Sequence, residues 1–339
     1  MEERDSEPSD TNIHLCGVNK NIHMKAISIK AYGTPEVLEV TEQEMPVPAP
    51  DEVLVKVKAI GINYADLLIR KGVYPMIPQF PAIMSGEISG EVIQTGSAVT
   101  HLQPGQQVTG YAPGGYAAYA AVPAAGLTVL PQGLEPSRGL LSQALTAQHL
   151  LEQASRYQSV VITAAAGGVG SNALQLARIR GVKQIIAITG STHKHDYVRS
   201  LGATHALSTE DPSWLQQLNA ITGHGADLIL DAIGGDTTSA LVQALAVNGT
   251  LIVYGSTSAQ PASLNPQDLI MKSARVIGST VYNIPPEQRQ QWLTYLIGLT
   301  EAGQLKGHVS SYPFTAVAQA HQDIEQRRTT GRTILVFPD

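Results

Sequence analysis

The sequence predicts an α/β protein in which a doubly wound parallel sheet is joined to a second, β-rich domain. From residue 136 onward, short apolar segments alternate with stretches of helical period, which is the order expected for such a sheet. Before residue 136, short alternating segments are interrupted by Pro and Gly clusters, which are typical of a small barrel-like β domain. A strand, a glycine turn and a helix follow one another over residues 159–177, and this segment organises the rest of the chain.

Length and composition limit the possible classes of protein. The chain has 339 residues, of which 43% are hydrophobic and 15% charged, enough for about two domains with large cores. A net charge of −6 argues against a general nucleic-acid-binding surface. The single cysteine, Cys16, excludes an internal disulfide and a cysteine cluster for zinc. Because no apolar run reaches the roughly 20 residues of a membrane span, and the first residues are polar, we expect a cytoplasmic protein with no membrane partner.

The N-terminal part divides at Met24. Residues 1–23 are polar and lack periodicity, so we expect either a disordered extension or an artefact. Strand-like patterns begin at Met24 and continue to about Pro131, as in the alternating segment at residues 52–59. Further strands are predicted at residues 83–93, 107–111 and 120–123.

The central segment has the features of a dinucleotide-binding turn. Ser159–Thr163 is suited to a buried parallel strand, and a helix is predicted over Ser171–Arg180. Glycines in the turn let the backbone approach a pyrophosphate, and the free N–H groups of the first helical turn favour its charge. We therefore expect the pyrophosphate at Ala166, Gly167, Gly168, Val169 and Gly170. The alternative is a tight turn without a ligand.

Alternation of strands and helices continues after this turn. Strands are predicted at residues 160–163, 185–189, 228–230, 251–254 and 275–279, and helices at 171–180, 193–201, 214–222 and 237–246. Ligands bind at the carboxyl ends of such strands. A helix at 286–302 and a strand at 333–337 close the chain, and we expect this last part to return to the first domain. The predicted division is therefore residues 24–135 with 284–339, and residues 136–283.

Residues after the second strand indicate the cofactor. An NAD site normally places a carboxylate there, but the segment from Thr189 contains none before Asp196. Ser191 offers a hydroxyl and Lys194 a positive charge, which suit the 2′-phosphate of NADPH, although Lys194 also fits a solvated helix face. Gly255 and Ser256 end a later strand and are expected near the nicotinamide ribose. For Asp231, a role at the cofactor and a role in a turn remain equally open.

Several motifs in combination resemble one family. They are Gly-Thr-Pro-Glu-Val-Leu (33–38), Gly-Ile-Asn-Tyr-Ala-Asp (61–66), Arg-Lys-Gly-Val-Tyr-Pro (70–75), Gly-Glu-Ile-Ser-Gly-Glu-Val (86–92), Gln-Ala-Leu-Thr-Ala (143–147), Ala-Ala-Ala-Gly-Gly-Val-Gly (164–170) and Asp-Ala-Ile-Gly-Gly (231–235). From Met24 onward the chain resembles the zinc-free, zeta-crystallin-like quinone oxidoreductases of the medium-chain dehydrogenase/reductase superfamily. This resemblance implies a GroES-like catalytic domain at 24–135 and 284–339, a Rossmann domain at 136–283, and a homodimer built through the cofactor domains.

The resemblance also implies that no zinc is bound. Zinc enzymes of the superfamily carry a His where this chain has Gly86, and a Cys in the loop that here holds Asn63. A catalytic zinc normally needs three protein ligands of His, Cys or carboxylate type. We therefore predict neither a catalytic nor a structural zinc.

Site residues follow from the resemblance together with the residue pattern. The family places Thr146 near the nicotinamide, and it supports Asn63 and Tyr74 in the active site. Asn63 can bond either the nicotinamide ribose or a substrate oxygen, whereas Tyr64 fits packing at least as well as a pocket. Where the family often has a Tyr at the adenosine, Thr209 stands here. The predicted catalytic residues are Asn63, Tyr64 and Tyr74; the predicted cofactor-binding residues are Asn63, Thr146, Ala166, Gly167, Gly168, Val169, Gly170, Ser191, Lys194, Gly255 and Ser256.

The function expected from these residues is NADPH-dependent hydride transfer to quinones without zinc. One alternative is an NADPH-dependent reductase of enone or enal double bonds, which needs a proton donor such as Tyr64 or Tyr74. An alternative of another class is a non-catalytic, structural or regulatory NADPH-binding protein. The sequence leaves open the physiological acceptor, the number of electrons transferred at a time, the oligomeric state and the nature of residues 1–23.

Overall fold

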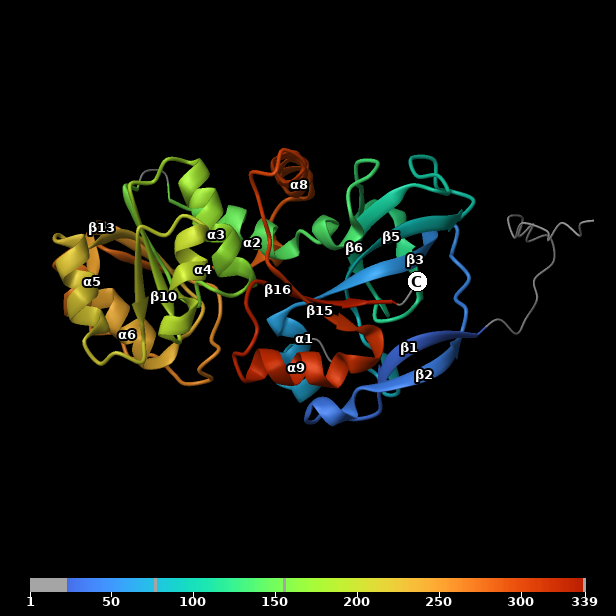
Figure 1. Ribbon diagram of the computed structural model, residues 1–339, viewed down its shortest axis with the longest axis horizontal. Helices are drawn as coiled ribbons and strands as arrows, with labels where there is room; N and C mark the ends of the chain where they lie inside the picture. The colour runs from blue at the N-terminus through green and yellow to red at the C-terminus, as the bar shows by residue number, and fades with distance from the viewer. Residues whose placement is uncertain (1–22, 76–77, 155–156, 338–339) are drawn as a thin grey trace, which may run out of the picture.

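The computed structural model describes residues 23–75, 78–154 and 157–337, which form two lobes lying side by side (Figure 1). The strands are β1 His23–Ile29, β2 Glu39–Glu44, β3 Glu52–Ile62, β4 Ala82–Ile83, β5 Gly86–Thr95, β6 Gln107–Ala112, β7 Tyr119–Pro123, β8 Leu127–Val129, β9 Ser159–Ile162, β10 Gln184–Thr189, β11 His205–Ser208, β12 Ala226–Asp231, β13 Leu245–Val253, β14 Arg275–Gly278, β15 Val309–Pro313 and β16 Arg332–Val336. The α-helices are α1 Tyr64–Lys71, α2 Ser142–Glu152, α3 Gly168–Ile179, α4 His195–Ser200, α5 Trp214–Thr222, α6 Gly235–Gln243, α7 Pro266–Ile270, α8 Pro286–Glu301 and α9 Val317–Glu325.

One lobe contains the predicted doubly wound sheet. Its six strands are all parallel and run in the order β11-β10-β9-β12-β13-β14. The strand order reverses between β9 and β12, and such a switch point is where a Rossmann sheet binds its ligand. The α/β fold class is thus confirmed. The strand that the sequence did not reveal is β11, whose four residues His-Ala-Leu-Ser are too short and too polar to show a pattern.

The other lobe is built mainly on antiparallel strands, with one parallel pair formed by β15 and β16. A seven-stranded sheet has the order β15-β16-β3-β5-β6-β8, with β7 also paired to β3, and a smaller sheet has the order β2-β1-β4. Within the larger sheet, the last strand of the chain pairs antiparallel with an early one, since Thr333 lies opposite Ile62. Both ends of the described chain therefore contribute to this lobe, as Figure 1 shows.

Helix α8 packs with the parallel sheet. Its buried residues Leu296, Ile297 and Leu299 share one core with strand β9 and with helices α2 and α3. The division of the chain at residues 135 and 283 remains a prediction, and the packing of α8 favours a later return to the first lobe. Residue 23 begins β1, and the rest of the predicted extension, residues 1–22, lies outside the described part of the chain.

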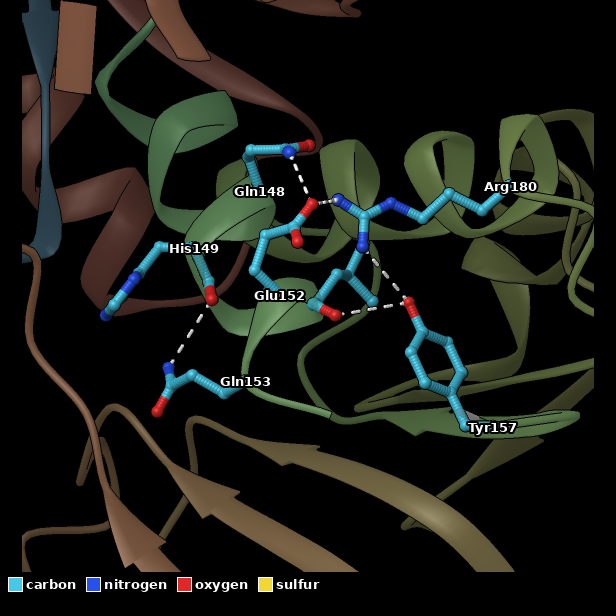
Figure 2. Close-up of polar contacts among 7 residues, drawn as sticks. Gln148, His149, Glu152, Gln153, Tyr157 and Arg180 are labelled. Atoms are coloured by element: carbon cyan, nitrogen blue, oxygen red, sulfur yellow. Dashed lines mark hydrogen bonds and ion pairs between the residues drawn. The ribbon is translucent and has the colours of Figure 1, made fainter. Parts of the chain in front are cut away.

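A polar cluster joins the carboxyl ends of α2 and α3 (Figure 2). Arg180, the C-cap residue of α3, pairs with Glu152 of α2 at 2.7 Å and donates to the Tyr157 hydroxyl at 3.3 Å. Gln148 donates to the same Glu152 carboxylate at 2.9 Å. These contacts add to the apolar core that α2 and α3 share, which packs the two helices together. Helix α2 was not among the predicted helices.

No helix within the described ranges is long and apolar enough to cross a membrane.

Candidate functional site

The glycine turn lies at the carboxyl end of β9. Gly167 is the N-cap residue of α3, and its N–H donates to the Ala164 carbonyl at 2.9 Å. Gly170 has no space for a side chain, because a Cβ there would lie 2.6 Å from both the Ala164 oxygen and the Ala165 Cα. The start of α3 therefore packs directly on the end of the strand. N–H groups in the first turn of a helix lack partners within the helix, so the turn can hold a pyrophosphate.

A segment from the end of the chain lies along this turn. Residues 327–331 connect α9 with β16, and the Gly331 N–H donates to the Ala166 carbonyl at 2.8 Å. Lys194 donates to the carbonyls of Arg327 at 2.7 Å and Thr329 at 3.0 Å. The ammonium group has three hydrogens, so one remains for a ligand. The predicted adenosine end of the site is thus shared between the two lobes.

Two cations lie together at this end of the site. Burial lowers the pKa of Lys194, and the positive charge of Arg327 lowers it further. Within the described residues, neither side chain has a carboxylate oxygen within 4 Å, whereas Arg199 pairs with Asp196 at 3.5 Å on the surface. Two like charges held together without an anion fit a phosphate, which requires this positive charge and these donors. Sequence reasoning missed Arg327, whose only signal was a basic pair far from the glycine turn.

Ser191 and the second glycine segment also end strands of the parallel sheet. The Ser191 hydroxyl follows β10 and bonds His193 Nδ1 at 2.6 Å. Gly255 and Ser256 follow β13. Asp231 is fully buried and accepts hydrogen bonds from the Thr163 hydroxyl at 2.9 Å and from nearby backbone N–H groups. Through these contacts Asp231 holds the turn after β12 in place. This is the turn role, one of the two roles that the sequence left open for Asp231.

Asn63 lies where β3 ends and α1 begins, facing the first residue of α2. Its own N–H donates to the Asp66 carboxylate at 2.9 Å, and its side chain lies 3.3 Å from the Ser142 hydroxyl. Ser142 donates through its N–H and its hydroxyl to Glu87, at 2.7 and 2.6 Å. A three-residue chain therefore links Asn63 to both lobes. On the same helix, the Thr146 hydroxyl donates to the Ser142 carbonyl at 2.9 Å.

The next residue of α2 contacts the glycine turn. Gln143 Nε2 donates to the Ile62 carbonyl at 3.4 Å, and its Oε1 is buried without a hydrogen-bond partner among the described residues. The carboxamide lies so close to Gly168 that a Cβ at residue 168 would overlap it. A buried acceptor beside the turn fits a ligand that carries hydroxyl or amide donors. NADPH has such donors on its riboses and its carboxamide, so the residues present fit this cofactor.

Two tyrosine hydroxyls meet across the lobes. Tyr74 follows α1, Tyr282 follows β14, and their hydroxyl oxygens are 2.9 Å apart. Burial and the bond to Tyr282 raise the pKa of Tyr74, so the hydroxyl stays protonated and can donate. Tyr282 was not predicted from the sequence. Of the two tyrosines predicted from the sequence, Tyr74 belongs to this pair. Tyr64 begins α1, is 37% exposed and is not part of the pair.

The position of the zinc-binding His in related enzymes is sterically closed here. A Cβ at Gly86 would lie 2.4 Å from the ring of Tyr116, which is completely buried. The Tyr116 hydroxyl donates to Asp66 at 2.9 Å, so the ring is held in that place. Larger side chains at residue 86 therefore have no room. This agrees with the absence of zinc that the resemblance implies.

Comparisons with known proteins agree with this architecture. Residues 49–132 match the family described as alcohol dehydrogenase GroES-like domain, and residues 168–298 match the one described as zinc-binding dehydrogenase. The second match covers most of the parallel-sheet lobe from the start of α3 onward, and it includes neither Asn63 nor Gly86. A quinone oxidoreductase of Pseudomonas aeruginosa is 32% identical over 325 residues, covering 92% of this chain and 99% of that protein. The human quinone oxidoreductase is 29% identical, covering 93% and 98%.

Solved structures show the same likeness. The quinone oxidoreductase of Escherichia coli complexed with NADPH superposes with a TM-score of 0.84 at 28% identity, covering 92% of this chain and 99% of that one. A mycobacterial protein complexed with NADPH gives the same TM-score, identity and coverage.

Proposed function

The chain belongs to the zinc-free quinone oxidoreductases of the medium-chain dehydrogenase/reductase superfamily, and we propose on this basis that it reduces quinones with NADPH. The observation that carries the choice of cofactor is that Lys194, which binds the Arg327 main-chain carbonyl, and the Arg327 side chain both lie beside the glycine turn, and neither cation has a carboxylate of the described residues within 4 Å. A carboxylate at this place would favour NADH and repel a 2′-phosphate. When bound, NADPH supplies the hydride.

The remaining residues of the proposed site bind the cofactor and orient the acceptor. The N–H groups from Gly168 to Gly170 hold the pyrophosphate, while Ser191, Lys194 and Arg327 hold the 2′-phosphate. Thr146, Gly255, Ser256 and Asn63 border the nicotinamide half. The hydroxyl pair of Tyr74 and Tyr282 donates to an oxygen of the acceptor. No strong side-chain acid is needed, because the anion of a reduced quinone is aromatic.

The tyrosine pair also supports a second candidate, the reduction of enone or enal double bonds. That reaction needs a proton at the α-carbon, and a neutral hydroxyl pair can supply one. A proton donor that is essential for double-bond reduction is dispensable for quinone reduction. Tyr74→Phe and Tyr282→Phe therefore separate the two activities.

We expect purified protein to oxidise NADPH rapidly with 9,10-phenanthrenequinone, and NADH more slowly, when absorbance at the nicotinamide band is followed. An α,β-unsaturated ketone is the second acceptor. Turnover with the ketone but not with the quinone, together with its loss in Tyr74→Phe, would indicate that the protein is a double-bond reductase. NADPH binding without turnover on a broad acceptor panel would favour the non-catalytic alternative.

We also propose that the protein is a homodimer assembled through the parallel-sheet lobe. Within the described residues, β14 is an edge strand of the sheet, and the adjacent helix α7 and its end expose Ile270 (68%) and Met271 (71%). Unpaired edges beside exposed apolar side chains commonly receive another chain. The cytoplasmic location expected from the sequence stays a prediction.

Sedimentation velocity of the full chain is expected to give the mass of a dimer. Ile270→Glu combined with Met271→Glu places two charges in the proposed interface, so the mass should fall to that of a monomer. Val47→Glu serves as the control, since Val47 is similarly exposed at 76% but lies between β2 and β3 in the other lobe. A wild-type protein that sediments as a monomer at micromolar concentration would refute the homodimer.

A further inference from the structure

The buried carboxylate of Glu87 lies behind Asn63. Glu87 is 5% exposed, and in the register of β3 and β5 it stands opposite Gly61. The missing side chain of Gly61 makes room for it, because a Cβ there would lie 2.7 Å from Glu87 Oε2. The carboxylate accepts two hydrogen bonds from Ser142, the first residue of α2. Nothing in the sequence pattern connected Glu87 with the site.

The Ser142 hydroxyl has a single hydrogen, and two oxygens lie within reach of it. Glu87 Oε2 is 2.6 Å away, and the side-chain oxygen of Asn63, as placed, is 3.3 Å away. A carboxylate can only accept, and a short bond to it is stronger than a long bond to an amide. The Ser142 hydroxyl therefore donates its hydrogen to Glu87. It has no second hydrogen to donate to Asn63.

The contact with Asn63 then requires the amide to present its nitrogen. Oxygen and nitrogen of an amide are assigned from the hydrogen-bond network, and two oxygens without a hydrogen between them repel. With the NH₂ group facing Ser142, Asn63 donates to the hydroxyl oxygen. The Asn63 side chain also faces the N–H of Asp66, as in a capping box. That N–H donates to the Asn63 main-chain carbonyl at 3.0 Å, so it keeps a partner when the amide oxygen points elsewhere.

We propose that Glu87, acting through Ser142, orients the Asn63 amide so that its oxygen is left to accept a hydrogen bond from a ribose hydroxyl of the nicotinamide half. This rests on the proposed binding of NADPH. It decides between the two roles that the sequence left open for Asn63, because a ribose hydroxyl donates whereas a quinone oxygen only accepts. Glu87 and Ser142 are positioning residues in this arrangement.

Reversing the direction of the hydrogen bonds tests the proposal. Asn63→Asp places a carboxylate against a hydroxyl whose hydrogen is already donated to Glu87, so the Kd for NADPH, measured by fluorescence without acceptor, should rise about 10-fold or more. In the double variant Asn63→Asp with Glu87→Gln, the new amide at residue 87 donates to Ser142, and Ser142 donates in turn to the carboxylate introduced at residue 63. The Kd should then return to within about threefold of the wild type.

Adenosine 2′,5′-bisphosphate, which lacks the nicotinamide half, separates a local effect from general damage. Its Kd should be unchanged in all variants, and Glu91→Gln on the same strand should bind NADPH normally. The proposal is overturned if the double variant binds no better than Asn63→Asp alone, or if the bisphosphate is weakened equally. Absence of quinone turnover in a wild type that binds NADPH would refute the proposed activity and leave the orientation of Asn63 intact.

Discussion

Replacing Arg327 and Lys194 together by alanine is expected to raise the Kd for NADPH by about two orders of magnitude, since each bond to a charged group contributes about 1.5–3 kcal/mol. The Kd for NADH should rise far less, only by the part that comes from loosening the segment 327–331, because NADH has no 2′-phosphate for these cations to bind. Isothermal titration with each cofactor measures both constants. The discrimination between the cofactors should therefore disappear.

Arg327→Ala is the more informative of the single variants. Lys194 also holds the segment 327–331 through two carbonyls, so its removal loosens the cover of the glycine turn as well. Arg327→Ala leaves the main-chain carbonyls in place and removes only the guanidinium group. Arg199→Ala is the matched control, because Arg199 is an exposed cation of the same region that pairs with Asp196. Equal losses for NADPH and NADH would contradict the assignment.

Asp66→Asn is expected to stabilise the protein above pH 7 and to flatten its pH dependence. Burial raises the pKa of Asp66 from 3.8 to about 7, more than hydrogen bonds from the Asn63 N–H and the Tyr116 hydroxyl lower it. The folded state therefore binds the proton more tightly than the unfolded state. Its free energy of unfolding falls as the pH rises from about 4 to about 7, by an amount on the order of a few kcal/mol, and then levels off.

Asparagine keeps an oxygen for the Tyr116 hydroxyl and for the Asn63 N–H, but it cannot ionise. Denaturant unfolding at pH 5 and pH 8 measures the difference between variant and wild type. His321 works in the opposite direction, since burial lowers its pKa to about 3, and stability is lost as the pH falls from 6.5 toward that value. Its contribution cancels in the comparison. A variant whose stability relative to wild type is the same at both pH values would contradict the raised pKa.

Local patterns in the sequence determined the parallel sheet and the glycine turn. The apolar strands around β9, β10 and β12, together with the small residues at 164–170, are contiguous in the chain, so their periodicity alone reveals them. The preference for NADPH also followed locally, from the lack of a carboxylate between Thr189 and Asp196. The sequence did not predict α2 and α9, because tertiary contacts, rather than capping residues or hydrophobic periodicity, determine where these helices pack.

Only the tertiary structure showed which distant residues come together at the proposed site. Lys194 and Arg327 are 133 positions apart, Tyr74 and Tyr282 are 208 apart, and Glu87 is 55 positions from Ser142. Hydrophobic period and turn chemistry describe neighbours along the chain and contain no information about such pairs. The first pair arises because β16 returns to β3 and thereby brings the segment 327–331 onto the glycine turn. The other two form where α1 and β5 of one lobe meet the other lobe. The sequence by itself therefore determined the fold and the cofactor, whereas the docking of the two lobes determined which side chains are available to hold the cofactor and its acceptor in the proposed site.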